Sequence, residues 1–168
     1  MTRRLILMRH GKSDWATGAA SDFDRPLNRR GEKDVPRMGA WLRKQGLVPD
    51  RIVSSPALRA RQTALLAAVS LGYPEDRIEW RREIYEAGCE RLLDLLGRLQ
   101  PPVPLTLMVG HNPGFEDLIE HLAAANPLAG EDKALPTAAM VGLELPDDWT
   151  RLQSESGRVI GHMRPRWL

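Results

Sequence analysis

The chain has 168 residues, which suits one globular domain over residues 1–168 and leaves little room for a second independent core. Hydrophobic residues make up 42% and charged residues 27%, so the chain is too apolar for a disordered protein, and a net charge of +2 with only 5% aromatic residues argues against a dedicated nucleic-acid surface. A single cysteine, Cys89, excludes an internal disulfide and a cysteine-based zinc site. The apolar runs are too short for a signal segment or a membrane span, so we expect a cytoplasmic protein.

The first part of the chain predicts a strand, a long loop and a helix. Residues 4–8 are continuously apolar, as in a strand buried on both faces. A polar loop follows, and Asn28 can cap a helix that runs to about Lys44. Pro36 lies inside that helix and is expected either to kink it or to delay its start.

The middle of the chain predicts a second unit of strand and helix. Residues 51–54 form a short strand, and Ser55-Pro56 opens a helix that ends near Gly72. Its buried side is expected to carry Leu58, Leu65 and Val69.

A third strand at 78–80 precedes a helix, which has leucines at 92, 95, 96 and 99 and ends before two prolines. Residues 105–109 form another continuous apolar strand, after which Asn112 is expected to be an N-cap and Pro113 the first helical residue.

The remaining chain predicts two more strands, at 140–145 and 159–163, and its most disordered piece is expected at 127–133. Strands that alternate with helices indicate an α/β protein: a three-layer α/β/α sandwich around a mostly parallel sheet.

Two of the predicted strands end in similar residues. The strand at 4–8 leads into Arg-His-Gly and the strand at 105–109 into Gly-His-Asn. Ligands of open α/β sheets bind at the carboxyl ends of the strands, so His10 and His111 face each other if these strands are near neighbours. A helix N-terminus after His111 and the permanent charge of Arg9 both favour an anion. The sequence therefore predicts a positive pocket with two imidazoles, suited to a phosphoryl group.

A further positive charge follows the strand at 51–54. Arg59 and Arg61 both lie at the start of the next helix, and they point about 200° apart around it. Only one of them can face the pocket, and their spacing does not decide which.

Three blocks stand in order along the chain: Arg9-His10-Gly11; Ser55-Pro56 with Arg59-Ala60 and Gln62-Thr63-Ala64; and Gly110-His111-Asn112-Pro113. Together they resemble the signature of the histidine phosphatase superfamily, also called phosphoglycerate mutase-like. The short length, residues 9–13 (Arg-His-Gly-Lys-Ser) and residues 136–139 (Pro-Thr-Ala-Ala) look most like its compact SixA-type phosphohistidine phosphatase branch. The resemblance implies the phosphoglycerate mutase-like fold.

The resemblance implies a role for each matched residue. His10 is expected to attack phosphorus and form a phosphohistidine intermediate that water then hydrolyses. Arg9, Arg59 and His111 are expected to hold the phosphoryl oxygens, with Arg59 chosen over Arg61 because it precedes Ala-x-Gln-Thr. No metal and no other cofactor are implied.

A zinc site is the alternative suggested by converging histidines. His10, His111 and Asp14 are its candidate ligands. The positive charges of Arg9 and Arg59 in the same pocket would repel a dication, so we do not expect zinc there.

The proton donor is less well marked. Larger family members carry an acidic residue after the third strand, and Glu86 is nearest to that position, with Asp14 and Asp22 on the loop after His10 as alternatives. The residues expected to contact substrate besides the three cationic groups are Gly11, Lys12, Ser13 and Asn112.

The expected function is a metal-independent phosphatase that acts on a phosphorylated protein, with protein phosphohistidine as the first choice. The alternatives are a phosphatase of a small phosphometabolite and a non-catalytic module that binds a phosphorylated partner. Neutral His10 with protonated His111 predicts a rate that rises and falls in the imidazole range of pH. No nucleic-acid or membrane partner is expected, and the sequence does not indicate the oligomeric state.

Overall fold

The computed structural model, which describes residues 1–15, 18–131 and 134–168, has a six-stranded sheet with the order β3-β2-β4-β1-β5-β6. Strands β1 to β4 are parallel to one another, and β5 is antiparallel to both of its neighbours, β1 and β6. In chain order, the strands are β1 (Thr2–Arg9), β2 (Arg51–Ser54), β3 (Glu79–Trp80), β4 (Leu105–Gly110), β5 (Met140–Pro146) and β6 (Arg158–Met163). The mostly parallel sheet was predicted correctly.

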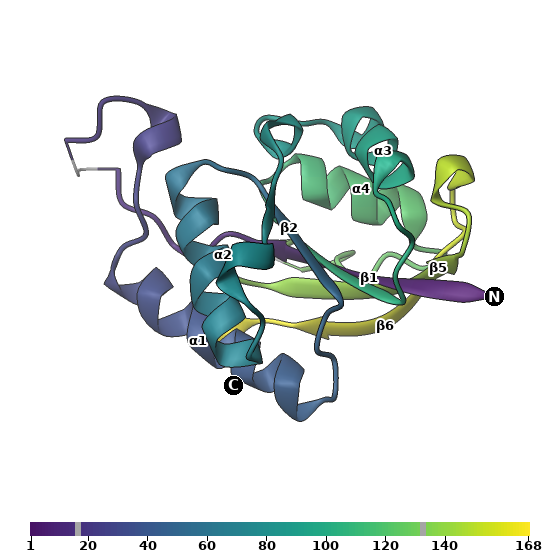
Figure 1. The fold of residues 1–168 in the computed structure, drawn as a ribbon, viewed down its shortest axis with the longest axis horizontal. Helices are drawn as coiled ribbons and strands as arrows, with labels where there is room; N and C mark the ends of the chain where they lie inside the picture. The colour runs from purple at the N-terminus through teal and green to yellow at the C-terminus, as the bar shows by residue number, and fades with distance from the viewer. Residues whose placement is uncertain (16–17, 132–133) are drawn as a thin grey trace.

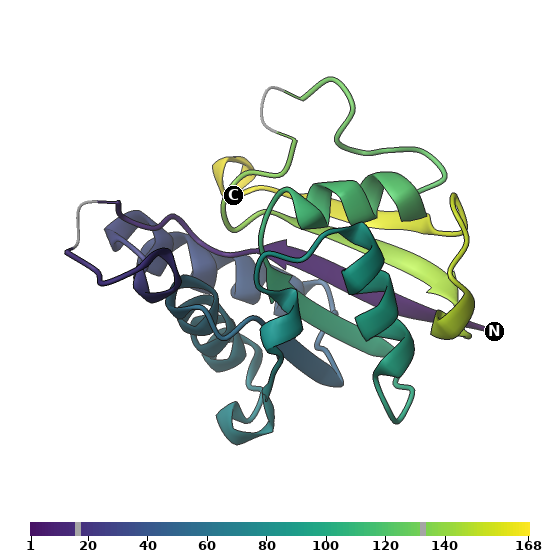
Figure 2. The same ribbon diagram turned by 90° about the horizontal axis from the view of Figure 1, so that it is seen from above.

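Helices cover both faces of the sheet, which makes three layers (Figures 1 and 2). α1 (Arg29–Lys44) and α2 (Leu58–Leu71) lie on one face. α3 (Cys89–Arg98) and α4 (Gly114–Leu122) lie on the other. The predicted α/β/α sandwich is confirmed.

Strand β1 is apolar without alternation because each of its faces meets a different helix layer. Leu5 and Leu7 belong to the core shared with α3 and α4, whereas Ile6 and Met8 belong to the core shared with α1 and α2. A strand in the middle of a covered sheet therefore needs an apolar residue at every position.

Helix α1 begins as predicted at a capped residue. The Asn28 side chain accepts a hydrogen bond from the backbone N–H of Gly31 at 3.0 Å, and the helix starts at Arg29. Pro36 lies within the helix and does not delay its start.

The predicted buried side of α2 is wrong. Val69 is 74% exposed, and Leu58 and Leu65 are only partly buried. The buried face consists of Arg59, Ala60, Thr63, Ala64, Ala67, Ala68 and Leu71. The reason is a close approach of α1 to α2: a Cβ added at Gly39 would lie 2.8 Å from Cβ of Ser70. Small residues therefore face α1, and the larger ones are displaced to the sides.

Helix α4 begins differently from the prediction. Pro113 is the N-cap itself, and the side chain of Asn112 makes no cap hydrogen bond. Asn112 Nδ2 instead donates to the carbonyl oxygen of Leu135 at 2.8 Å. This bond ties the segment that leads into β5 to the carboxyl end of β4.

Two further features concern side chains and order. Cys89, the single cysteine, is half-buried at the first position of α3. Of the segment expected to be disordered, residues 132 and 133 lie outside the described residues. Within the described part of the chain, no helix is long and apolar enough to cross a membrane.

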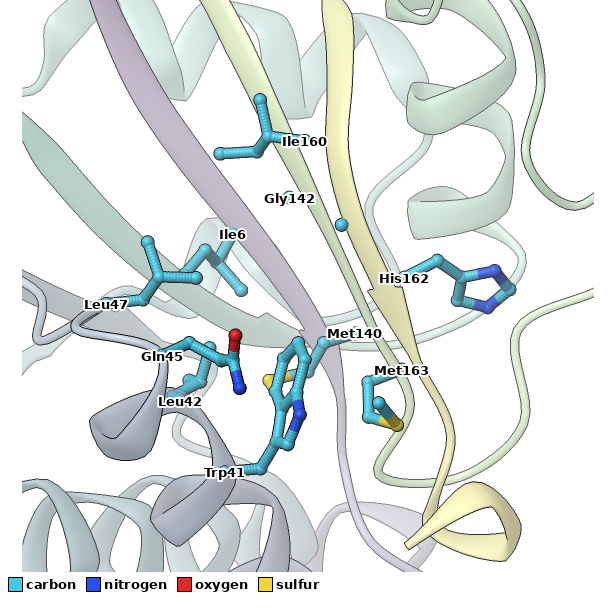
Figure 3. Close-up of a pocket in the computed structure, with 11 residues that line it drawn as sticks. Ile6, Trp41, Leu42, Gln45, Leu47, Met140, Gly142, Ile160, His162 and Met163 are labelled. Atoms are coloured by element: carbon cyan, nitrogen blue, oxygen red, sulfur yellow. The ribbon is translucent and has the colours of Figure 1, made fainter.

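An apolar pocket of about 170 Å³ lies between the end of α1 and strands β1, β5 and β6 (Figure 3). Trp41 and Leu42 face it from the helix, and Ile6 and Met140 face it from the sheet. None of the residues that line it also lines the pocket that contains His10.

Candidate functional site

The strand order brings the predicted site residues to one edge of the sheet. β4 lies between β2 and β1, so the residues that follow these three strands are neighbours. Arg9 pairs with Gly110 in the parallel register, and His10 and His111 follow directly. The two imidazole rings lie with their centroids 5.2 Å apart. The predicted convergence of the two histidines therefore occurs.

His10 is held in an orientation that suits a nucleophile. Its Nδ1 lies 2.8 Å from the carbonyl oxygen of Gly11, which can only accept, so the ring proton is on Nδ1 and the lone pair is on Nε2. Burial lowers the pKa of His10 well below its ordinary value, and the hydrogen bond to Gly11 opposes this shift. The proximity of His111 and the positive charge of Arg9 lower the pKa further. His10 is therefore neutral at physiological pH, as an attacking imidazole must be.

A buried threonine positions the turn after His10. The backbone N–H of Gly11 donates to Thr63 Oγ1 at 3.0 Å, and the Thr63 hydroxyl donates to the carbonyl oxygen of Arg59 at 2.7 Å. A Cβ added at Gly11 would lie 2.9 Å from Val35 Cγ2, so only glycine fits against α1 here. One hydroxyl group thus connects the His10 turn with the first turn of α2.

Of the two candidate arginines, Arg59 lies in the pocket. It is 6% exposed, and its Nε lies 3.4 Å from His10 Nε2. Arg61 is exposed and stacks over Trp80 at 4.7 Å, outside the pocket. The helix geometry predicted that only one could face the pocket, and the structure places there the arginine that the family resemblance implied.

Asp22 accepts hydrogen bonds from both terminal nitrogens of Arg59. Arg59 Nη1 donates to the Asp22 carbonyl oxygen at 2.7 Å, and Nη2 donates to Oδ2 at 3.0 Å. Tyr85 and Arg25 also donate to the Asp22 carboxylate, at 2.7 and 3.0 Å. Partial burial by itself raises the pKa of Asp22, but the hydrogen bonds from Tyr85 and Arg59 outweigh it and hold the pKa at about 2. The same contact and partial burial raise the pKa of Tyr85 to about 12.

His111 is buried against Ser55. Its Nε2 lies 2.8 Å from Ser55 Oγ, which already accepts from the backbone N–H of Ala57 at 3.2 Å. The Ser55 proton is therefore available to His111 Nε2, which places the ring proton on Nδ1. Burial, followed by the charge of Arg59, lowers the pKa of His111 to about 4. This disagrees with the expectation of a protonated His111, because burial and the neighbouring arginines disfavour a positive charge on its ring.

Buried polar atoms around the pocket lack partners. Within the described residues, Nε of Arg9 and Nδ1 of His111 are buried and accept or donate no hydrogen bond. The other end of Arg9 is held, since Nη1 donates to the carbonyl oxygen of Leu135 at 3.1 Å. Buried donors without acceptors are costly, and the oxygens of a bound phosphoryl group would provide acceptors.

The pocket has a volume of about 230 Å³. The residues that line it are Arg9, His10, Lys12, Ser13, Trp15, Asp22, Arg25, Arg59, His111, Asn112 and Thr137. Of the residues expected to contact substrate, Lys12, Ser13 and Asn112 line the pocket, whereas Gly11 does not.

The three candidate proton donors are placed differently. Asp22 lines the pocket, and Asp14 does not. Glu86 is exposed, has a left-handed backbone with φ of 58°, and contacts the hydroxyl of Tyr85 rather than the pocket. Glu86, the first-ranked donor, therefore does not line the pocket. Its neighbour Tyr85 reaches the site instead, with its ring centroid 5.5 Å from that of His111 and its hydroxyl bonded to Asp22.

Sequence reasoning left several site residues without a role. Thr63 and Ser55 are part of the quoted motif blocks, and their positions there were a usable signal. The loop after β1 brings in Arg25 and the segment after β3 brings in Tyr85, and no local pattern marks either residue. Trp15 also lines the pocket; it is 78% exposed and stacks with Arg25 at 3.5 Å.

A metal site has no evident ligand set here. In the part of the chain that the structure describes, no three His, Cys, Asp or Glu side chains gather as metal ligands. The guanidinium groups of Arg9 and Arg59 beside the histidines are arranged to attract an anion.

Comparison with known proteins agrees with this geometry. A model of the histidine phosphatase superfamily (branch 1) matches residues 5–93. An uncharacterized chloroplastic protein of Arabidopsis thaliana is 33% identical over 135 residues, and the match covers 75% of this chain but only 62% of that protein. An uncharacterized protein of Mycobacterium tuberculosis is 30% identical over 167 residues, which cover 95% of this chain and 100% of the relative.

A solved structure of the protein histidine phosphatase SixA in complex with tungstate has a similar fold. It superimposes with a TM-score of 0.75 at 27% sequence identity and covers 97% of both chains. The likeness therefore extends over nearly the whole of this chain.

Proposed function

The chain belongs to the histidine phosphatase superfamily and is a histidine-dependent phosphatase, and we propose that it hydrolyses protein phosphohistidine through a phosphohistidine intermediate on its own His10. One observation supports phosphohistidine as the substrate. Asp22 is the only carboxylate among the described residues that line the pocket, and its pKa is about 2. The pocket therefore offers no protonated carboxylic acid at neutral pH.

The first chemical step is attack by His10. Nε2 carries the lone pair, since Nδ1 donates to the Gly11 carbonyl oxygen. The Nε2–P bond forms as the bond from phosphorus to the leaving group breaks, and the leaving group takes that electron pair. A water molecule then attacks phosphorus, the P–Nε2 bond breaks, and inorganic phosphate leaves with His10 again neutral.

Positive groups stabilise the phosphoryl group during both steps. Arg9 and Arg59 supply fixed charge, and the Nδ1–H of His111 supplies a neutral donor. The terminal nitrogens of Arg59 donate hydrogen bonds to Asp22, so phosphate must compete with Asp22 for them. Binding of the substrate and release of Asp22 from Arg59 are therefore coupled.

The lack of a carboxylic acid favours a substrate with a good leaving group. An alcohol leaves as a strong base and needs a proton from the enzyme, whereas the imidazole of phosphohistidine is protonated near neutral pH and leaves without such help. A site that holds the phosphoryl group well and donates protons poorly is thus better matched to an N–P bond than to an alkyl ester.

The test is a comparison of leaving groups with purified protein in excess EDTA. We expect kcat/KM to rise steeply from phenyl phosphate to p-nitrophenyl phosphate to a phosphohistidine peptide. His10→Ala is expected to abolish all three activities. His121→Ala, which changes a histidine of α4 outside the pocket, is expected to leave them unchanged.

Three outcomes would contradict the proposal. Equal kcat/KM for phenyl and p-nitrophenyl phosphate would mean that the enzyme does supply a proton, which would favour a phosphometabolite ester as substrate. Phosphate binding without turnover of any substrate would indicate a binding module. Activity that survives in His10→Ala would remove His10 as the nucleophile.

A further inference from the structure

A second hollow of about 470 Å³ adjoins the histidine pocket. Its lining residues are Arg9, Lys12, Arg30, Pro136, Thr137, Arg164 and Arg166. Arg9, Lys12 and Thr137 line both hollows, so the two are continuous. A molecule whose phosphoryl group lies beside His10 can therefore extend into this second hollow.

The second hollow is strongly positive. Five of its seven described lining residues are basic and none is acidic. Lys12 makes no ion pair within the described residues, and Arg30 shares the buried carboxylate of Asp34 with Arg37, at 3.5 Å each. The lining therefore gathers cationic groups that repel one another unless an anion joins them.

The cationic groups of the C-terminal segment are held in place by the fold. Arg164 is 1% exposed, and its Nη2 donates to the carbonyl oxygen of Ala134 at 2.8 Å. Glu131 lies 3.9 Å from Arg164 and 3.6 Å from Arg166, so one carboxylate serves both guanidinium groups. The side chains of Arg30 and Arg166 are 67% and 61% exposed, which leaves their donors accessible to a ligand.

We propose that this hollow binds a second anionic group of the substrate, next to the phosphoryl group that is transferred. The proposal rests on the phosphatase function and narrows its substrate class: a phosphohistidine flanked by an acidic side chain. A guanidinium group binds carboxylate and phosphate through paired N–H donors, so the second phosphate of a small molecule would present the same chemistry. The experiment below distinguishes these two ligands, an acidic side chain next to the phosphohistidine and the second phosphate of a small molecule.

The experiment measures selectivity for a second charge. The first substrate pair is 3-carboxyphenyl phosphate and its neutral isostere 3-carbamoylphenyl phosphate. The second pair is a phosphohistidine peptide with Asp next to the phosphohistidine and the same peptide with Asn. The third pair is 1,3-propanediol bisphosphate and 3-hydroxypropyl phosphate. For each pair, the ratio of kcat/KM values reports recognition of the second charge.

The test variant is Arg30→Gln with Arg166→Gln, which removes two exposed cations of the hollow. The matched control is Arg29→Gln with Arg43→Gln, which removes the same charge from exposed positions of α1 outside it. We expect the test variant to lower the charged-to-neutral ratio about tenfold at low salt and the control to leave it within about twofold. Hydrolysis of p-nitrophenyl phosphate, which has no second charge, is expected to be unchanged in both.

The outcomes distinguish a flanking acidic residue from a second phosphate, and a failure of the second site from a failure of the phosphatase function. A fall in the ratio for the peptide pair assigns the hollow to a flanking acidic residue, and a fall confined to the bisphosphate pair assigns it to a second phosphate. Equal falls in the test variant and the control would mean a general field effect and would overturn the second site, as would no fall in either. If no substrate is hydrolysed, the phosphatase proposal fails. Calorimetric binding of 3-carboxyphenyl phosphate to the two variants then still tests the second site. Weaker binding by the test variant alone supports the second site, and equal binding by both variants overturns it.

Discussion

Replacement of Thr63 by valine removes the hydroxyl group that joins the His10 turn to α2 and leaves the shape of the side chain unchanged. Thr63 is fully buried, accepts from the backbone N–H of Gly11 at 3.0 Å and donates to the carbonyl oxygen of Arg59 at 2.7 Å. The variant Thr63→Val therefore leaves a buried N–H without an acceptor and creates no cavity.

The free-energy change follows from these two bonds. A buried N–H that loses its acceptor costs about 1–3 kcal/mol, and the second bond contributes about 1 kcal/mol. A methyl group in place of the hydroxyl recovers about 1 kcal/mol through burial. We expect the free energy of unfolding to fall by about 2 kcal/mol, which lowers Tm by about 4–8 °C. We also expect kcat/KM to fall, because the turn that orients His10 loosens.

Thr106→Val is the matched control. Thr106 is fully buried in β4, and its hydroxyl has no hydrogen-bond partner within the described residues. The same substitution there removes an unsatisfied polar group, so we expect unchanged or higher stability, by up to about 1–2 kcal/mol, with unchanged kcat/KM. Urea unfolding of both variants measures the difference. Equal destabilisation of the two, or none in Thr63→Val, would refute the hydrogen-bond reasoning.

Further predictions concern pH, packing and charge. In the folded protein the pKa of His111 is about 4, below its ordinary 6.5. The unfolded chain therefore binds more protons, and the free energy of unfolding falls as the pH drops from 6.5 towards 4. In urea unfolding, the loss of stability from pH 7 to pH 5 is expected to be about 1–2 kcal/mol smaller in His111→Gln than in wild type. A Cβ at Gly114 would collide with the backbone carbonyl of Ala87, so Gly114→Ala is expected to cost more than about 2 kcal/mol in thermal unfolding. Gly88 has open space around it and is the N-cap of α3, so Gly88→Ala is expected to cost about 1 kcal/mol or less. Asp22→Asn removes the carboxylate that competes with phosphate, and the inhibition constant of inorganic phosphate is expected to fall severalfold; an unchanged or higher constant would contradict the competition.

Local patterns in the sequence were sufficient to predict the elements around the site. The apolar runs that became β1 and β4, and the capping by Asn28, depend on neighbours within a few residues. The convergence of His10 and His111 was predicted from the rule that ligands bind at the carboxyl ends of strands, provided that the two strands are near neighbours. In the structure β1 pairs directly with β4.

Other features depended on distances between elements, which periodicity does not contain. The small buried face of α2 follows from the close approach of α1. The position of Asp22 on Arg59, and of Glu86 outside the pocket, depends on how two long connections fold over the sheet edge. The low pKa values of His10 and His111 result from burial among charges that come from different strands.

The sequence by itself therefore determined the order of strands and helices, the two histidines and the family that they resemble, because each of these rests on residues that are close in the chain. The tertiary structure places Arg59 beside His10, as the family resemblance implied. Only the tertiary structure decided that Asp22 rather than Glu86 lines the pocket, and that Arg30 and Arg166 meet in a second hollow. These are contacts between side chains far apart in sequence, and their distances are set by strand order and helix packing.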